Sequence, residues 1–145
     1  MSVALIESGD EEDVVKLLIA FAEEHDGPYS ADYESCRALF KQILRGGVGF
    51  MARSSAGLPL GAIAGLFTRS IFNRKVVLCG EVFWYVVPKA RGSAIGGKLF
   101  LEYEKAGKTA AHGITMTLLD TSPGMDDNLK KRGFVQKERS YVLWQ

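Results

Sequence analysis

The sequence contains few of the residues that disulfide scaffolds and metal centres require. Its 145 residues include two cysteines, Cys36 and Cys79, and two histidines, His25 and His112. Two cysteines that form no Cys-x-x-Cys pair do not make the disulfide framework of a small secreted domain. A zinc site would need several carboxylate ligands besides the two distant histidines. We therefore expect neither a disulfide scaffold nor a metal centre.

The chain also lacks long hydrophobic runs and an excess of charge of one sign. No apolar stretch approaches the roughly 20 residues of a membrane span, and the N-terminus has no basic or apolar segment of signal-peptide type. The 18 basic and 17 acidic residues leave a net charge of +1. Broad attraction to nucleic acid or anionic membrane is therefore not expected, although a local basic patch is compatible with this balance. We expect a cytoplasmic protein that binds neither nucleic acid nor membrane.

What the sequence does contain is the composition of an ordinary globular protein. Apolar residues make up 47% and charged residues 24% of the chain, close to the average for soluble domains. A chain of this length buries a hydrophobic core without covalent staples, and no repeat or linker divides it. The composition predicts a single domain over residues 1–145.

Glycine and proline divide the chain into short alternating elements. Apolar residues at helical spacing predict four helices, which begin after a capping box at Ser8 and Glu11, after Ser30, at Arg91 and at Pro123. Gly133 is expected to end the last one. Runs rich in β-branched and aromatic residues predict strands at 3–6, 48–53, 60–68, 76–87, 114–119, 134–135 and 140–144. This order predicts the α/β (mixed α+β) class: a mixed, mostly antiparallel sheet of about seven strands, with four helices on both faces.

The most informative stretch covers residues 86–99, where a strong strand ends at Pro88 and an amphipathic helix follows a loop of small residues. A helix N-terminus offers up to four unpaired N–H groups and about half a positive charge. Small residues there let a phosphate approach the backbone, so the junction is typical of diphosphate binding. Arg91 and Lys98 would add positive charge. The alternative interpretation is that the glycines only allow close packing of the helix on the sheet.

Two familiar glycine motifs do not match this stretch. Gly92, Gly97 and Lys98 have the spacing of a P-loop, but Leu99 stands where the magnesium-binding hydroxyl is required. A dinucleotide-binding fingerprint would follow the first strand of the fold, whereas this loop follows the fourth predicted strand. Neither a P-loop nor a Rossmann site is therefore expected.

Arg91-Gly92-Ser93-Ala94-Ile95-Gly96 resembles the signature Gln/Arg-x-x-Gly-x-Gly/Ala of the GCN5-related N-acetyltransferases, a superfamily of acyl-CoA-dependent enzymes. The segment matches at Arg91 and Gly96 and departs at Ala94, where glycine is usual. Residues 85–88 resemble the strand end that precedes this signature in the family, and residues 129–134 resemble its Tyr-Glu-Lys-x-Gly-Phe segment. The order of elements also fits, so the resemblance covers essentially the whole chain.

The resemblance implies an N-acyltransferase of the GCN5-related fold that transfers acetyl from acetyl-CoA to a primary amine of a small molecule or protein. Transfer would proceed by direct attack in a ternary complex without a metal. The strand main chain would pair with the pantetheine arm, and the loop would hold the pyrophosphate. A homodimer through edge strands is common in the family. The implied cofactor-binding residues are Trp84, Tyr85, Val86, Val87, Arg91, Gly92, Ser93, Ala94, Ile95, Gly96, Gly97, Lys98 and Ser122.

The catalytic residues are less directly indicated, because the tyrosine that the family often uses to protonate the thiolate corresponds to Leu129. Glu81 and Tyr85 stand four positions apart on one predicted strand, so we expect them to share a face. Glu81 would act as base, directly or through water, and Tyr85 as acid. The alternatives are a solvated strand-edge carboxylate and a packed aromatic ring.

The sequence is compatible with several amine acceptors and with more than one class of function. Acidic residues around Glu24, at the end of the first predicted helix, favour a cationic amine, although an ordinary solvated helix end explains them equally. Leu129 supports a second hypothesis, a catalytically silent acyl-CoA-binding module that acts as a sensor or interaction partner. A third is an α/β domain that binds no cofactor.

Overall fold

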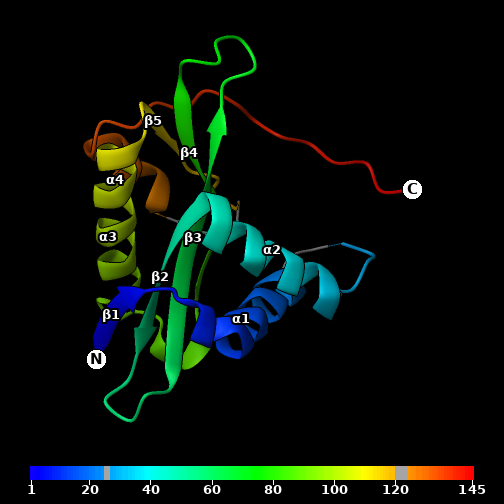
Figure 1. Ribbon diagram of the computed structural model, residues 1–145, viewed down its shortest axis with the longest axis vertical. Helices are drawn as coiled ribbons and strands as arrows, with labels where there is room; N and C mark the ends of the chain where they lie inside the picture. The colour runs from blue at the N-terminus through cyan, green and yellow to red at the C-terminus, as the bar shows by residue number, and fades with distance from the viewer. Residues whose placement is uncertain (25–26, 120–123) are drawn as a thin grey trace. The chain divides into compact units, whose positions relative to one another are not determined.

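The computed structural model describes residues 1–24, 27–119 and 124–145 and divides into two compact units, Met1–Thr115 and Met116–Gln145. The first unit holds the sheet and three helices, and the second holds a short helix and an extended tail (Figure 1). The single domain expected over residues 1–145 stays a prediction.

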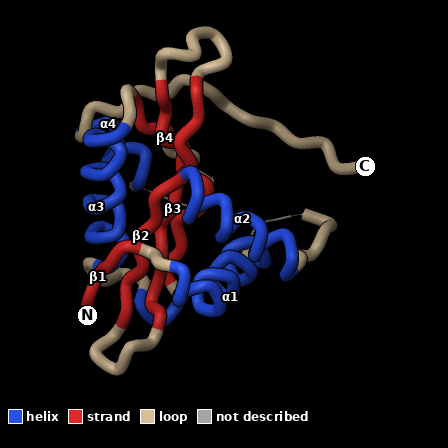
Figure 2. The backbone as a smooth tube through the Cα atoms, viewed as in Figure 1, coloured by secondary structure: helices blue, strands red, loops and turns tan. Residues whose placement is uncertain are grey.

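The first unit is built on one mixed sheet in the order β1-β2-β3-β4-β5 (Figure 2). Neighbouring strands are antiparallel except β4 and β5, which are parallel. The strands are β1 (Ser2–Leu5), β2 (Gly47–Arg53), β3 (Pro59–Arg69), β4 (Val77–Val86) and β5 (Gly113–Thr115). The predicted mixed, mostly antiparallel α/β architecture is therefore confirmed.

The predicted number of seven strands is not confirmed, because the described residues form five. Residues 134–135 and 140–144 belong to no strand, and the strand expected at 114–119 is reduced to Gly113–Thr115. A run of β-branched and aromatic residues becomes a strand only where a neighbouring strand takes up its main-chain hydrogen bonds. Local composition therefore predicted more strands than the described residues form.

Four α-helices are described: α1 (Glu11–Glu23), α2 (Tyr33–Gly46), α3 (Ile95–Ala110) and α4 (Met125–Lys131). Two of the predicted helix N-caps are formed by other residues than expected. The N–H of Glu7 donates to Asp10 at the head of the 3-10 turn η1 (Ser8–Asp10), and Asp32, not Ser30, caps α2 by accepting from the Ser35 N–H at 2.8 Å. Gly133 follows α4 with φ +91°, as expected for a glycine that ends a helix.

The helices of the first unit cover both faces of its sheet, as predicted (Figure 1). On one face α1 and α2 pack against the strands, and Phe21 of α1 contacts the rings of Phe83 and Tyr85 edge-on. On the other face α3 packs through the Trp84–Phe100 stack, with ring centroids 5.5 Å apart. The core on the α1 side consists of Ile6, Val14, Val15, Leu17, Leu18, Phe40, Ile43, Met51, Ala62, Ala64, Phe83 and Tyr85.

Candidate functional site

The site predicted from the sequence lies where β4 passes into α3. Pro88 begins a 3-10 turn, η2 (Pro88–Ala90), and Gly92 adopts a left-handed φ of +78° that turns the chain toward the helix. The Ser93 hydroxyl donates to the Ala90 carbonyl at 2.6 Å and accepts from the Ile95 N–H at 3.4 Å. The helix begins at Ile95, not at Arg91 as predicted, because Arg91 is extended and Gly92 is left-handed.

The glycines of this junction face open space. A Cβ at Gly92 or Gly97 would meet no heavy atom within 4 Å, and one at Gly96 would make only ordinary contacts, 3.7 Å from Val86 and 3.9 Å from Trp84. Close packing of helix on sheet therefore does not require glycine at any of these positions. The open backbone suits a ligand that must approach main-chain amides closely, as a diphosphate does.

At the end of β4 away from the junction, β4 and β5 pair over only three residues, Leu78 to Gly80. From Glu81 onward the main chain of β4 pairs with β3, and no described strand pairs with its other edge. An open strand edge can hydrogen-bond an extended chain in the manner of an added strand. This edge belongs to the stretch Trp84 to Val86, for which the sequence predicted pairing with a pantetheine arm, and at its end the Val86 carbonyl accepts from Arg91 Nε at 2.8 Å.

A β-bulge interrupts β4 where β5 ends. Ala64 pairs with Phe83 and Gly65 pairs with Glu81, so Val82 is an extra residue on β4. An extra residue reverses the alternation of side chains between the two faces. The prediction that Glu81 and Tyr85 share a face is therefore wrong: four positions apart in a regular strand would align them, but the bulge lies between them.

Glu81 points to the face of the sheet that α3 covers. It lies opposite Gly65, and a Cβ at Gly65 would point at the Tyr103 hydroxyl. Tyr103 is fully buried, and its hydroxyl donates to the Cys79 carbonyl at 3.3 Å. Burial first, and then the contact with Cys79, raise the pKa of Tyr103 above its ordinary value. The sequence places Tyr103 only within the predicted helix that begins at Arg91, so its position beside Glu81 was not predicted.

Tyr85 points to the opposite face, toward α1. Its ring is buried, and its hydroxyl donates to Glu24 at 3.0 Å. Burial, followed by the hydrogen bond to Glu24, raises the pKa of Tyr85. Glu24 also accepts from the Arg91 guanidinium, which approaches both carboxylate oxygens at 2.7 Å. The structure thus brings Tyr85 and Arg91 together around Glu24, whose pairing with the loop was not predicted.

The other predicted residues differ in their surroundings. The side chains of Ser93, Ala94 and Lys98 are exposed at the junction, while Ile95 is buried beneath it. Val87 is half-buried, and its N–H donates to the Leu60 carbonyl at 2.9 Å. Ser122 lies outside the described residues. Leu129 is buried in α4, within the second unit.

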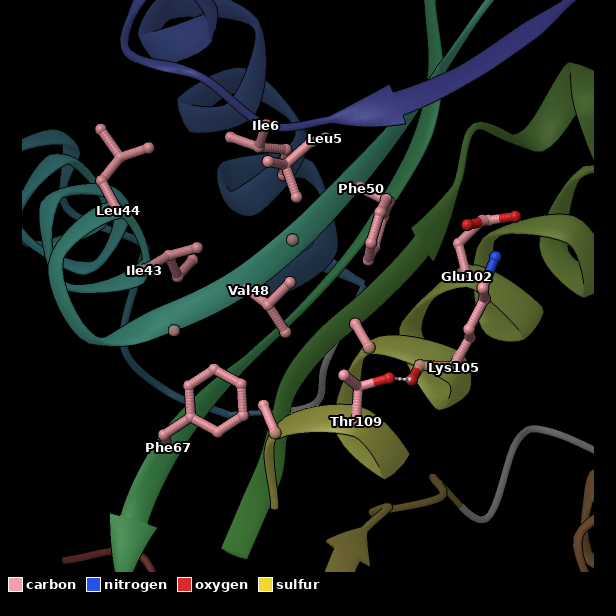
Figure 3. Close-up of a pocket in the computed structure, with 14 residues that line it drawn as sticks. Leu5, Ile6, Ile43, Leu44, Val48, Phe50, Phe67, Glu102, Lys105 and Thr109 are labelled. Atoms are coloured by element: carbon pink, nitrogen blue, oxygen red, sulfur yellow. Dashed lines mark hydrogen bonds between the residues drawn. The ribbon is translucent and has the colours of Figure 1, made fainter. Parts of the chain in front are cut away.

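A cavity of about 500 Å³ lies away from this junction (Figure 3). It is lined mostly by apolar side chains of β1, β2 and α2, and Glu102, Lys105 and Thr109 of α3 form its polar side. The cavity shares no residue with the predicted site. In the described parts of the chain, no three His, Cys, Asp or Glu side chains gather as metal ligands, and no helix is long and apolar enough to cross a membrane.

Solved structures with the same fold include several acetyltransferases. A probable acetyltransferase superposes with a TM-score of 0.78 at 15% identity, covering 99% of this chain and 97% of the other. Ribosomal-protein-alanine N-acetyltransferase from Brucella melitensis has a TM-score of 0.71 at 17% identity and covers 99% of both chains. AAC(6')-Iy, in complex with the bisubstrate analogue CoA-S-monomethyl-acetylneamine, has a TM-score of 0.72 at 12% identity and covers 99% and 97%.

No protein-family model matches the sequence, and no curated protein is found as a relative. The structural likeness therefore concerns the fold. The chain has the fold of these acetyltransferases, and the resemblance drawn from its sequence is confirmed at that level.

Proposed function

We propose that this protein is an acyl-CoA-dependent N-acyltransferase that transfers acetyl from acetyl-CoA to a primary amine of a small molecule or a protein. The observation that carries the proposal is the open glycine face at the start of α3, directly beside the edge of β4 that no described strand pairs beyond Gly80. These two features suit the diphosphate and the extended arm of one coenzyme molecule. The acetyltransferase fold supports the same assignment.

The residues at the junction fit the chemistry of such a ligand. The amides at the start of α3 and the partial positive charge of the helix end would hold the diphosphate. The side chain of Lys98, exposed in the first turn, would add charge. Main-chain groups of Trp84 to Val87 would hold the pantetheine arm. The proposal also includes the role predicted for Ser122, which is to line the cofactor.

The transfer itself needs a neutral amine and a proton for the departing thiolate. The amine nitrogen forms a bond to the acyl carbon as the carbon–sulfur bond breaks; the nitrogen loses one proton and the sulfur gains one. A lysine-like amine has a pKa of about 10.4, so a base is required near neutral pH. We assign this role to Glu81, directly or through water, because it follows Gly80, where β5 leaves β4.

The acid that protonates the thiolate is proposed as Tyr85. Its hydroxyl donates to Glu24, so the proton would reach the thiolate only after this hydrogen bond has opened. The arrangement also suits a different role, in which Tyr85 orders the loop around Arg91. A cytoplasmic location and a homodimer through edge strands complete the proposal.

The decisive experiment is calorimetric titration with acetyl-CoA and with desulfo-CoA. We expect both to bind, because the proposed contacts hold the diphosphate and the arm rather than the sulfur. Gly96→Glu should weaken binding at least about 100-fold, since a carboxylate would lie against the diphosphate. Gly46→Glu, at the end of α2 where a Cβ meets no heavy atom within 4 Å, should bind as the wild type does. Wild-type affinity in a folded Gly96→Glu protein would contradict the assignment.

A catalytically silent acyl-CoA-binding module is the second candidate, and it is favoured by Leu129, which stands where the family often has the acid tyrosine. Both candidates bind acetyl-CoA, but only an enzyme releases free thiol when amines are present. A panel of primary amines with a thiol-reactive reporter separates the two. A domain without a cofactor would bind neither acetyl-CoA nor desulfo-CoA.

A further inference from the structure

Glu24 occupies an electrostatically unfavourable place that a residue of the α3 loop compensates. It caps the C-terminal end of α1, where the helix dipole is negative and the last turn holds no basic residue. Arg91, 67 positions along the chain, donates to both oxygens of its carboxylate. The cation that this helix end lacks is thus supplied by the loop that leads into α3.

Arg91 has further contacts that join the same three elements. Its Nε donates to the Val86 carbonyl at 2.8 Å, at the last residue of β4. Its guanidinium carbon lies 5.3 Å from the centre of the Tyr85 ring, a distance typical of a cation–π contact. The Tyr85 hydroxyl closes the group by donating to Glu24. The side chain of Arg91 therefore contacts both α1 and β4, through Nε, Nη2 and the guanidinium face.

We infer that Glu24, Arg91 and Tyr85 form a clamp that positions the diphosphate-binding loop, and that Arg91 acts through this clamp rather than as a ligand of the diphosphate. The inference rests on the proposed function for the identity of the ligand. Arg91 directly precedes Gly92, whose left-handed turn aims the chain into α3. Holding the Arg91 side chain against α1 and β4 therefore holds the direction in which the first amides of α3 point.

The clamp is suited to ordering the loop rather than to stabilising the whole fold. The side chains of Arg91 and Glu24 are 46% and 42% exposed, and ion pairs this accessible to water contribute little to global stability. Loss of the clamp should therefore leave the unfolding transition nearly unchanged and loosen residues 87–94. Glu24 and Tyr85 are positioning residues for acyl-CoA in this view.

The two possible roles of Arg91 predict opposite effects of Glu24→Gln. If Arg91 were a diphosphate ligand, removing the competing carboxylate would leave affinity for acetyl-CoA unchanged or raise it. If Glu24 and Arg91 form a clamp, affinity should fall about 3- to 10-fold, with a similar loss in Arg91→Ala. The double variant should lose no more than either single variant, because both break one unit. Glu23→Gln, the adjacent exposed carboxylate, is the matched control and should bind normally.

A second measurement decides the inference without any coenzyme. Amide hydrogen exchange of the unliganded protein should be faster at Ala90, Arg91 and Ile95, whose N–H groups donate within the loop, in Glu24→Gln than in Glu23→Gln, with equal exchange in β3. Unchanged exchange at the loop would overturn the clamp, as would higher acetyl-CoA affinity in Glu24→Gln. If the wild type binds no acetyl-CoA, the proposed function fails, while the exchange result still decides whether the clamp exists.

Discussion

The hydroxyl of Tyr103 occupies the space that a side chain on Gly65 would need. A Cβ at Gly65 would lie 2.5 Å from the Tyr103 hydroxyl oxygen and 2.7 Å from the Gly80 carbonyl oxygen. Gly65 lies opposite Glu81 in the β3–β4 ladder, at the bulge. The absence of a side chain on β3 thus allows α3 to approach the sheet beside the proposed catalytic carboxylate.

Gly65→Ala should lower the free energy of unfolding by about 1–3 kcal/mol, the usual cost of overpacking a close contact. The Gly80 carbonyl belongs to the β4 backbone and cannot move aside as a side chain can. Chemical denaturation measures the effect.

Two variants serve as controls for this prediction. Gly46→Ala, with open space around its Cβ at the end of α2, should be neutral or more stable by up to about 1 kcal/mol. Adding Tyr103→Phe to Gly65→Ala should restore only part of the loss, because the Gly80 carbonyl remains. Equal stability of Gly65→Ala and Gly46→Ala would contradict the packing described.

The buried Tyr103 should make the protein lose stability in alkaline solution. Its pKa is raised in the folded state from an ordinary value of 10.0, so the folded protein keeps a proton that the unfolded chain releases. The stabilisation is complete below pH 10 and is lost as the pH rises above it, by up to about 1.4 kcal/mol per pH unit. Denaturation between pH 9 and about 11.5 should show a shallower decline for Tyr103→Phe. Identical slopes would mean that this hydroxyl titrates normally.

Glu81 and Tyr85 should act independently, because the bulge separates them onto opposite faces. Glu81→Gln should lower kcat about 100-fold or more if the carboxylate is the general base, with little change in acetyl-CoA affinity. Tyr85→Phe separates acid from clamp: loss of an acid lowers kcat, whereas loss of the clamp lowers affinity. Thiol release at saturating acetyl-CoA and calorimetry measure the two quantities. Unchanged kcat in both variants would exclude both residues from catalysis.

Arg53 should contribute measurably to stability, unlike most surface ion pairs. Its guanidinium donates to Asp13 at 2.7 Å and to Asp10 at 2.8 Å, joining β2 to the start of α1, and only 27% of the side chain is exposed. Arg53→Met should cost about 1–3 kcal/mol in denaturation experiments, because two carboxylates lose their partner. Lys16→Met, which breaks an exposed pair with Glu12, should leave the denaturation midpoint unchanged.

The sequence determined the features that depend on neighbouring residues. The strand that stops near Pro88, the glycine-rich turn, the amphipathic helix after it and the stop at Gly133 all follow from local spacing and backbone preferences, so the acetyltransferase fold could be predicted. Glycine at residues 92, 96 and 97 indicated the proposed diphosphate site, because the absence of a side chain is visible in the sequence itself.

Which side chains meet at the site depends on how distant elements pack, and this could not be predicted from local spacing. An extra residue at Val82 turned Glu81 and Tyr85 to opposite faces, and no local pattern announces a bulge, which depends on the partner strand. Arg91 and Glu24 are brought together by the packing of α1 against β4. Residues 134–135 and 140–144 have strand composition but form no strand in the described structure. The spacing of residues along a chain predicts local geometry. Which strands pair and which face a side chain points to depend on the elements that pack against that segment.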